Sequence, residues 1–140
     1  MPFSGAGIRG IVGAMARVSP PPVTLVEAFV AVMPPECGGV PLDAFARAFW
    51  QVAPGRVRWG LHGVCLLLRG RAWLTGRGWA RCTVDERRRL IAGLGASRSA
   101  LVREVPALLK ALAAQGAFGH PEGQRAFGLP VDASPPFWSP

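Results

Sequence analysis

The feature that most constrains the fold of this chain is an apolar stripe with helical spacing between residues 99 and 112. Apolar side chains recur there every three or four positions, which places them on one face of an α-helix. They are Leu101, Val102, Val105, Leu108, Leu109 and Leu112. Ser97 or Ser99 can cap the amino end of this helix. Pro106 removes one backbone donor inside it, so we expect a kink or two abutting helices.

Four further helices are predicted before this one, and proline or glycine separates each from the next. They are expected at residues 24–33, 41–52, 56–69 and 83–92. Their expected buried faces carry Leu25, Phe29, Val32 and Met33, then Phe45, Ala48, Phe49 and Val52, then Val57, Leu61, Val64, Cys65 and Leu68, and finally Leu90, Ile91 and Leu94.

The third and fourth of these helices carry the most detailed signals. The third is apolar on several sides, because Trp59, Leu66 and Leu67 lie away from its main stripe, so we expect it to be central or covered by a partner. The fourth begins with a capping box of Thr83 and Glu86, in which each residue can bond the backbone amide of the other. Between them, residues 70–82 hold three glycines, three arginines and two tryptophans and are expected to form a loop.

No alternating strand pattern competes with these helices, so the fold class is all-α. A chain of 140 residues is long enough for one domain with a core. We expect a single compact helical domain of about five to six helices over residues 23–130. Residues 1–22, which end in three prolines, are predicted to be an irregular N-terminal arm, and residues 131–140 a proline–aromatic C-terminal tail.

Apolar residues are abundant in this chain and charged residues are scarce. Half of the sequence is hydrophobic and 17% is charged, against about 25% charged residues in a typical soluble domain. Some apolar surface is therefore expected to face a partner. No apolar run approaches the roughly 18 residues of a membrane span, so we expect none. The N-terminal residues lack an uninterrupted apolar core and a paired-arginine signature, so we expect cytoplasmic residence.

The net charge of +8 comes from fifteen Arg and one Lys against eight acids. Such an excess can serve an acidic protein surface or a nucleic acid. The alternative of an Arg-rich helical nucleic-acid-binding protein draws on Arg87, Arg88 and Arg89. It also draws on the arginines and tryptophans of residues 70–82, whose rings can stack on bases. The glycines between these arginines and tryptophans weaken the nucleic-acid alternative, so we favour contacts with a protein.

Groups suited to catalysis or metal binding are few. His62 lies on a mostly apolar helix and is expected to be structural. Cys37, Cys65 and Cys82 form no close pair, so we expect buried thiols instead of a disulfide or a zinc site. A small enzyme that uses His62 or His120 is a third hypothesis. The sequence predicts no catalytic residue, no cofactor-binding residue and no metal site in this chain.

Residues 88–130 show several features in a recognisable order. They are a capped helix rich in Arg and Leu, a Gly/Ser break, a Leu-rich helix that ends at Leu112, an aromatic at Phe118, a His-Pro-Glu helix start at His120, and then Phe127-Gly128-Leu129-Pro130. An early helix that ends at Met33-Pro34-Pro35 precedes them. Together these features resemble the gluconate 2-dehydrogenase subunit 3 family, over residues 24–138.

The members of this family are small subunits of flavin-dependent dehydrogenases and oxidases of the glucose–methanol–choline (GMC) class. The resemblance implies a non-catalytic subunit that binds and stabilises a larger flavoprotein or assists its maturation. That partner would hold FAD and oxidise an alcohol, a sugar or a sterol, and this chain would hold no cofactor. Many family members carry a twin-arginine export signal, whereas Arg9 stands alone here.

Aromatic residues and one histidine are the candidates for contact with such a partner. Obligate interfaces are more hydrophobic than transient ones, and aromatic anchors carry much of their energy. The candidates are Trp73, Trp79, Phe118, His120, Phe127, Phe137 and Trp138. Core packing is the alternative for Phe118 and Phe127, and anchoring of the loop to its own domain is the alternative for the two tryptophans.

Overall fold

The computed structural model describes residues 19–130, so residues 1–18 and 131–140 lie outside it. Within the described residues the chain forms six α-helices and three short 3₁₀ turns, and no strand. The α-helices are α2 (Val23–Val32), α3 (Leu42–Val52), α4 (Gly55–Leu74), α5 (Val84–Gly93), α6 (Ala100–Phe118) and α7 (Pro121–Ala126), and the 3₁₀ turns are η1 (Pro35–Cys37), η2 (Trp79–Arg81) and η3 (Leu94–Ala96). The predicted all-α fold with five to six helices is confirmed. The predicted tail and most of the predicted arm fall outside the described residues.

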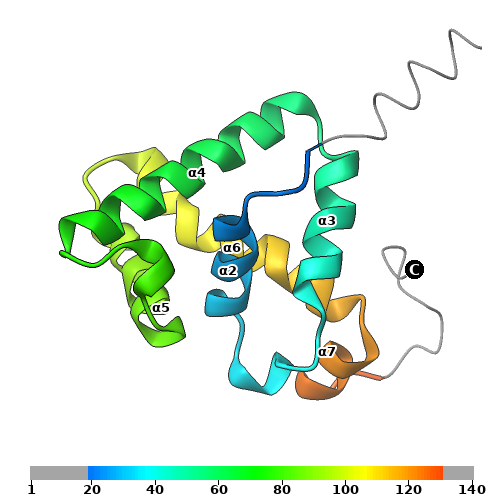
Figure 1. Cartoon of the computed structure of the whole chain (residues 1–140). Helices are drawn as coiled ribbons and strands as arrows, with labels where there is room; N and C mark the ends of the chain where they lie inside the picture. The colour runs from blue at the N-terminus through cyan, green and yellow to red at the C-terminus, as the bar shows by residue number, and fades with distance from the viewer. Residues whose placement is uncertain (1–18, 131–140) are drawn as a thin grey trace, which may run out of the picture.

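Helix α2 lies at the centre of the bundle and packs against α3, α4, α5 and α6 (Figure 1). Four of its ten residues, spaced three, one and two positions apart, are buried: Leu25, Ala28, Phe29 and Ala31. The long helix α4 crosses one side of the bundle, and α7 packs against α6 and η1 at the opposite end. The largest fully buried side chains are Leu25, Phe29, Phe45, Trp50, Leu68, Ile91, Leu94 and Leu109.

The carboxyl end of α2 is capped by an arginine from another helix. Arg88 of α5 donates from Nε to the carbonyl oxygen of Ala31 at 2.8 Å and from Nη2 to that of Met33 at 3.4 Å. Carbonyl groups at a helix end have no partner within the helix, so a donor from elsewhere stabilises them. Arg88 therefore ties α5 to the core helix at the point where Pro34-Pro35 stops α2.

The buried face of α3 differs from the predicted one. Val52, expected inside, is 73% exposed, whereas Trp50 is buried together with Leu42, Phe45 and Ala46. The cause is the path of the chain after α3, because α4 returns over Trp50. The ring of His62 packs edge-on against that of Trp50, with centroids 5.1 Å apart, and Arg58 donates to the Trp50 carbonyl.

Helix α4 continues to Leu74, so the loop predicted for residues 70–82 begins only at Thr75. A glycine such as Gly70 costs a helix about 1 kcal/mol relative to alanine, and the burial of Ala72 in the following turn offsets most of this cost. The Thr75 hydroxyl then donates to the Ala72 carbonyl oxygen at 2.6 Å and ends the helix. Gly76, with a φ of +86°, turns the chain towards η2.

The predicted starts of α5 and α6 are confirmed. Thr83 and Glu86 form the reciprocal capping box, and the Ser99 hydroxyl accepts from the amide of Val102. Helix α6 runs through Pro106 without dividing in two. Its predicted inward stripe is correct at Val105 and Leu109 and wrong at Leu101 and Leu108, which are 84% and 43% exposed.

Two glycines allow the close contacts that hold α3, α6 and α7 together. A Cβ on Gly116 of α6 would lie 2.7 Å from the ring of Phe45 in α3, inside the van der Waals distance. A Cβ on Gly123 of α7 would collide with the carbonyl oxygen of Ala117. Any larger residue at either position must therefore push two elements apart.

Candidate functional site

Two of the predicted partner-contact residues meet at the corner between α6 and α7. The rings of Phe118 and Phe127 pack edge to face, with centroids 4.9 Å apart. Both remain partly open to solvent, at 46% and 39% exposure. His120 lies between them in sequence and caps α7, because its Nδ1 accepts a hydrogen bond from the amide of Glu122. The two rings thus pack against each other and still expose apolar surface to solvent.

The Phe127-Gly128-Leu129 segment has a local structural role, which is to close α7. Gly128 adopts a φ of +69°, a conformation that favours glycine. Its amide donates to the carbonyl of Arg125, and the amide of Leu129 donates to that of Gln124 at 2.8 Å. These two bonds form a Schellman motif, in which glycine makes the turn. The corner is therefore a fixed feature of the fold.

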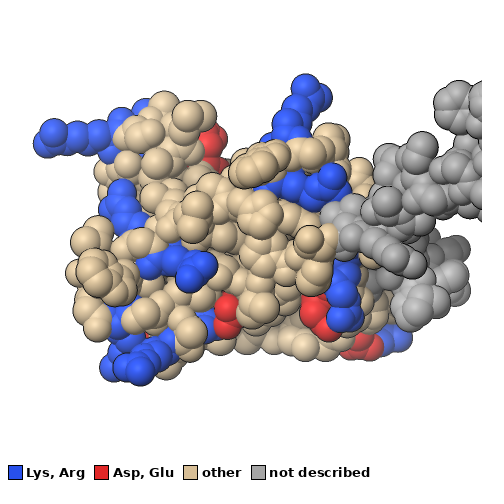
Figure 2. Space-filling view, turned by 45° about the horizontal axis from the view of Figure 1, so that its top comes forward, with Lys and Arg blue, Asp and Glu red and all other residues tan. Residues whose placement is uncertain are grey.

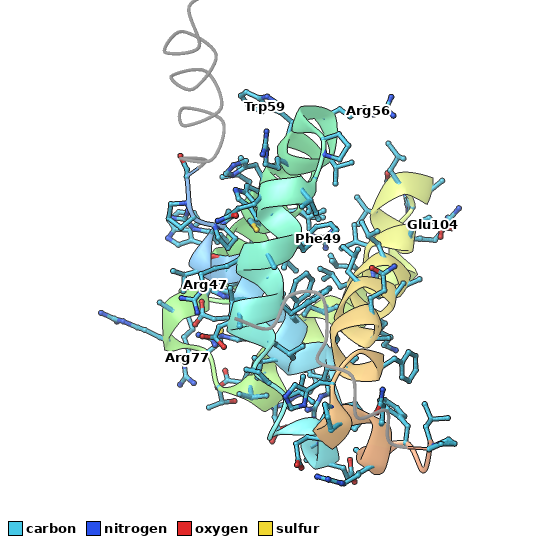
Figure 3. The ribbon with its side chains drawn as sticks, turned by 90° about the vertical axis from the view of Figure 1, so that its right-hand side faces the viewer. Arg47, Phe49, Arg56, Trp59, Arg77 and Glu104 are labelled. Carbon is cyan, nitrogen blue, oxygen red and sulfur yellow. The ribbon has the colours of Figure 1, made fainter. Side chains whose placement is uncertain are left out.

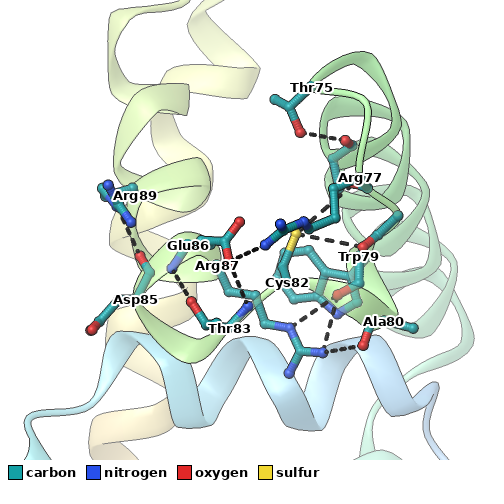
Figure 4. Close-up of polar contacts among 12 residues, drawn as sticks. Thr75, Arg77, Trp79, Ala80, Cys82, Thr83, Asp85, Glu86, Arg87 and Arg89 are labelled. Atoms are coloured by element: carbon teal, nitrogen blue, oxygen red, sulfur yellow. Dashed lines mark hydrogen bonds and ion pairs between the residues drawn. The ribbon is translucent and has the colours of Figure 1, made fainter.

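Trp79 is buried, at 4% exposure, and so is not available on the surface as we expected of a partner-contact residue. Its indole Nε1 donates to Oε1 of Glu27 in α2, and the Arg87 guanidinium lies 5.2 Å from the ring centroid. Arg87 also pairs with Oε2 of Glu27 at 2.8 Å. Figure 4 shows its second contact, in which the guanidinium donates to the Trp79 carbonyl. Trp79 thus anchors its loop to its own core, which is the alternative considered from the sequence.

The basic run Arg87–Arg89 is largely committed to internal contacts. Arg87 belongs to the contact with Glu27 and Trp79, and its side chain is only 11% exposed. Arg88 caps α2 and also pairs with Asp85. Only Arg89 is exposed, and it donates to the carbonyl of Asp85 in its own helix. The run therefore offers a nucleic acid fewer open guanidinium groups than its three arginines suggest.

Three exposed large apolar side chains of α4 lie in one line along its outer face, and Leu74, exposed at the last residue of the helix, lies off this line. Trp59, Leu66 and Trp73 are 78%, 66% and 76% exposed. They follow each other at intervals of seven residues, or about two helical turns, so they share one face and the outer two lie about 21 Å apart along the axis. The opposite face is buried in the core through Leu61, Cys65, Leu68 and Ala72. We call this line the α4 ridge.

Of the α4 ridge, sequence reasoning proposed only Trp73. Trp59, Leu66 and Leu67 were predicted only to lie outside the buried stripe, and the seven-residue spacing of Trp59, Leu66 and Trp73 is the signal that joins these three residues. Trp59 and Arg56 project to either side of the first turns of α4 (Figure 3). The ridge and the Phe118–Phe127 corner lie at opposite ends of the bundle, so the structure does not bring all predicted contact residues together (Figure 1).

Two adjoining hollows run beside the α4 ridge, between α4 and the start of α2. Each has a volume of about 710 Å³, and they share Thr24, Leu66 and Arg69 in their walls. The first also reaches Trp50, Trp59 and His62, and the second reaches Gly70, Trp73 and Trp79. Because they share these walls, they form one groove along α4.

The positive charge of the chain is concentrated around this groove. Residues 44–84 contain seven arginines and neither Asp nor Glu, so they account for +7 of a total charge of +8. These arginines are Arg47, Arg56, Arg58, Arg69, Arg71, Arg77 and Arg81. Arg47 and Arg77 pair with Asp43 and Glu86, whereas the four arginines of α4 make no ion pair with any described carboxylate. Figure 2 shows this side, with basic side chains spread over it and few acidic ones.

The three thiols and His62 have structural surroundings. Cys37, Cys65 and Cys82 are buried and free, as predicted. Burial raises the pKa of Cys65 to about 11, although Arg69 opposes the shift, and burial followed by the charge of Glu36 raises the pKa of Cys37. His62 is exposed and packs edge-on against Trp50. Both raised values keep these thiols protonated near neutral pH, where a thiol is a weak nucleophile.

Two predicted contact residues, Phe137 and Trp138, lie outside the described residues. Across residues 19–130, His, Cys, Asp and Glu side chains do not gather in groups of three that could hold a metal ion. In the same part of the chain no helix combines the length and apolarity needed to cross a bilayer.

Comparisons of the chain with family models, with curated proteins and with solved structures give no match. The likeness to the gluconate 2-dehydrogenase subunit 3 family therefore rests on the sequence features alone.

Proposed function

We propose that this chain is a non-catalytic helical subunit that binds a larger protein and stabilises it. The observation that carries the proposal is the α4 ridge, where Trp59, Leu66 and Trp73 are each at least 66% exposed on a helix whose other face is already buried. Soluble monomers rarely expose large contiguous apolar patches, and those that exist often mark binding sites. Tryptophan is also one of the residues enriched among binding hot spots.

The titratable groups support a role in binding. His120 is engaged in capping α7, and Cys37 and Cys65 have raised pKa values because of burial. General acid–base catalysis instead uses groups with pKa values near the working pH, brought together in a cleft. The large partner would supply the catalytic residues.

For the class of partner we propose an FAD-dependent oxidoreductase of the GMC type, which acts on an alcohol, a sugar or a sterol. This part of the proposal is supported by the sequence resemblance of residues 24–138. The Phe118–Phe127 corner, which contains several of the resembling residues, offers a second apolar surface for the same partner. FAD would be bound by the partner, with no cofactor in this chain.

Co-expression tests this proposal. The chain is produced with the GMC-type flavoprotein encoded nearest to it, with an affinity tag on one subunit only. We expect a single species on size exclusion that shows flavin absorption and contains both chains. We also expect the flavoprotein alone to be less soluble or less thermally stable, because a bound partner stabilises a folded state by mass action. Separate elution of both chains, with no change in the flavoprotein, would refute the proposal.

Nucleic-acid binding is the second candidate, favoured by the arginines around α4 and by the exposed rings of Trp59 and Trp73. Such binding falls steeply with salt because phosphate contacts release counterions. Retention on immobilised single-stranded DNA at low salt, with loss after Trp59→Ala and Trp73→Ala, would support this candidate. Passage through the column without retention would exclude nucleic-acid binding as a function of this chain.

A further inference from the structure

We infer that the α4 ridge is the docking face for the partner, and that it accepts an apolar helix with acidic side chains along its edges. This inference rests on the proposed function. It adds which of the two apolar surfaces is used and what chemistry that surface accepts. Two properties of α4 carry it, namely the glycines between its large side chains and the sign of the charge around it.

The ridge alternates large and small residues. Gly63 lies between Trp59 and Leu66, and Gly70 lies between Leu66 and Trp73, each four positions after a large residue and therefore beside it on the same face. A Cβ at Gly63 or Gly70 would meet no atom within 4 Å, so the packing of this chain does not require glycine there. In contrast, Gly116 is required, because a Cβ there would overlap Phe45.

These glycines leave gaps between the large side chains of the ridge. In helix pairs, side chains of one helix fit into the gaps of the other, and a seven-residue repeat keeps the contact in line over several turns. Trp59, Leu66 and Trp73 follow this repeat. The adjoining groove, with two hollows of about 710 Å³ each, provides room for the body of a second helix. A fluid lipid surface has no fixed side chains to fill such gaps, so the shape favours a protein helix.

The positive charge around the ridge favours acidic side chains along the edges of the partner helix. Arg56 and Arg69 lie three positions from Trp59 and Leu66, which makes them neighbours on the helix surface. Glu27 borders the groove, but its two oxygens are taken by Arg87 and the Trp79 indole. The arginines of α4 pair with no described carboxylate. Acidic side chains of a partner would complete these pairs and would speed its association.

The same charge disfavours two other occupants of the groove. A second copy of this chain would bring the arginines of its own α4 against those of the first, and like charges in contact are repulsive. The N-terminal residues 1–18 contain Arg9 and Arg17 and no acid, so they would also add positive charge to a positive surface. An acidic helix from a different protein is the occupant that neutralises the charge around the α4 ridge.

The inference is tested with two synthetic helical peptides of the same Leu-based heptad, one with Glu and one with Lys at the flanking positions. Fluorescence anisotropy measures their binding to the full chain and to three variants. We expect the Glu peptide to bind the wild type and the Lys peptide not to bind. Trp59→Ala with Trp73→Ala should weaken binding about 30-fold or more, as expected for lost hot spots. The control Leu101→Ala removes an exposed apolar side chain of α6 that borders neither hollow, and it should bind as wild type.

The third variant, Gly63→Ala with Gly70→Ala, separates docking from folding. Alanine fills the gaps and is a better helix former than glycine, so this variant should melt at a higher temperature and bind the Glu peptide about tenfold more weakly. A higher melting temperature with unchanged binding would mean that the glycines have no docking role, and would overturn the fit that we infer. Because all ridge positions are exposed, each variant should remain folded.

Further outcomes separate this inference from the proposed function. If the complex with the flavoprotein forms and depends on Phe118 but not on the ridge, the inference is wrong and the proposed function stands. If no such complex forms while the Glu peptide binds the ridge, the proposed function fails and the inference stands. Equal binding of both peptides, or of neither, overturns the inference. Ridge-dependent self-association, or tighter ridge-dependent binding to phosphatidylserine vesicles or single-stranded DNA, also overturns it.

Discussion

Replacement of Arg87 by alanine should destabilise the domain far more than the same change two positions later. Arg87 pairs with Glu27 at 2.8 Å, donates to the Trp79 carbonyl at 3.1 and 3.2 Å, and lies over the Trp79 ring. These contacts join α2, η2 and α5. Arg89, in contrast, is exposed and contacts only a carbonyl of its own helix. The pair of variants thus compares an internal guanidinium with a surface one in the same helix.

The expected loss for Arg87→Ala is about 3 kcal/mol. Hydrogen bonds to a charged group contribute about 1.5–3 kcal/mol, and a partly buried cation–π contact adds about 1 kcal/mol. The side chain of Glu27 is 28% exposed and keeps its bond from Trp79, so it can rehydrate in part and the loss stays below that of a fully buried pair. For a domain of this size the loss corresponds to a fall of about 10 °C in melting temperature.

Denaturant unfolding followed by circular dichroism measures both variants. Arg89→Ala should change the free energy of unfolding by less than about 0.5 kcal/mol, as surface substitutions usually do. A double-mutant cycle with Glu27→Gln, which keeps an acceptor for the Trp79 indole, should give a coupling energy of about 1–2 kcal/mol. Equal losses for Arg87→Ala and Arg89→Ala, or a coupling near zero, would refute the internal role of Arg87.

Four other outcomes are expected. Gly116→Ala should lower the free energy of unfolding by about 1–3 kcal/mol, because the new Cβ would overlap the ring of Phe45. Gly63→Ala should raise it by about 1 kcal/mol, because alanine is the better helix former. Chemical denaturation measures both changes. Cys65, whose pKa burial raises to about 11, should react with a thiol reagent only after unfolding, as spectrophotometry at neutral pH can show. The hydrogen bond from the Thr83 amide, with smaller contributions from the Thr83 hydroxyl and Arg77, holds the pKa of Glu86 below its ordinary value of 4.5. The stabilisation from this group is therefore present above pH 4.5 and is lost as pH falls through the lower folded pKa, so Glu86→Gln should flatten that acid dependence in unfolding titrations. Finally, added salt should raise the melting temperature of the isolated chain at low ionic strength, because it screens repulsion among the arginines of residues 44–84.

Local signals in the sequence were sufficient to predict most helix boundaries. The capping box at Thr83, the Ser99 cap and the start of α7 after His120 each depend on residues within three positions of one another. Such contacts form in the same way whatever the rest of the chain does. The all-α fold class and the number of helices follow from these boundaries and from the apolar period between them.

The wrong predictions involve contacts between distant parts of the chain. Trp50 is buried in place of Val52 because α4 folds back over α3. The helical period of α3 alone does not predict the side from which α4 returns. Helix α4 continues past Gly70 because Ala72 packs into the core. Trp79 is buried because Glu27, 52 positions earlier, accepts from its indole. In each case a tertiary contact outweighed a local preference, as propensity scales allow.

The contact surface was harder to predict because a buried stripe and a docking stripe look alike in sequence. On α4 both are apolar and both have helical spacing, and only the fold shows that Leu61, Cys65 and Leu68 face inward. The composition of the two stripes nevertheless differs in a physical way. The buried stripe has no glycine, since a core needs filled volume, whereas the exposed stripe places glycine between tryptophan and leucine. Gly63 and Gly70 neither turn the chain nor make room for a neighbour within it, so their place between the large side chains fits the docking role that we infer for the α4 ridge.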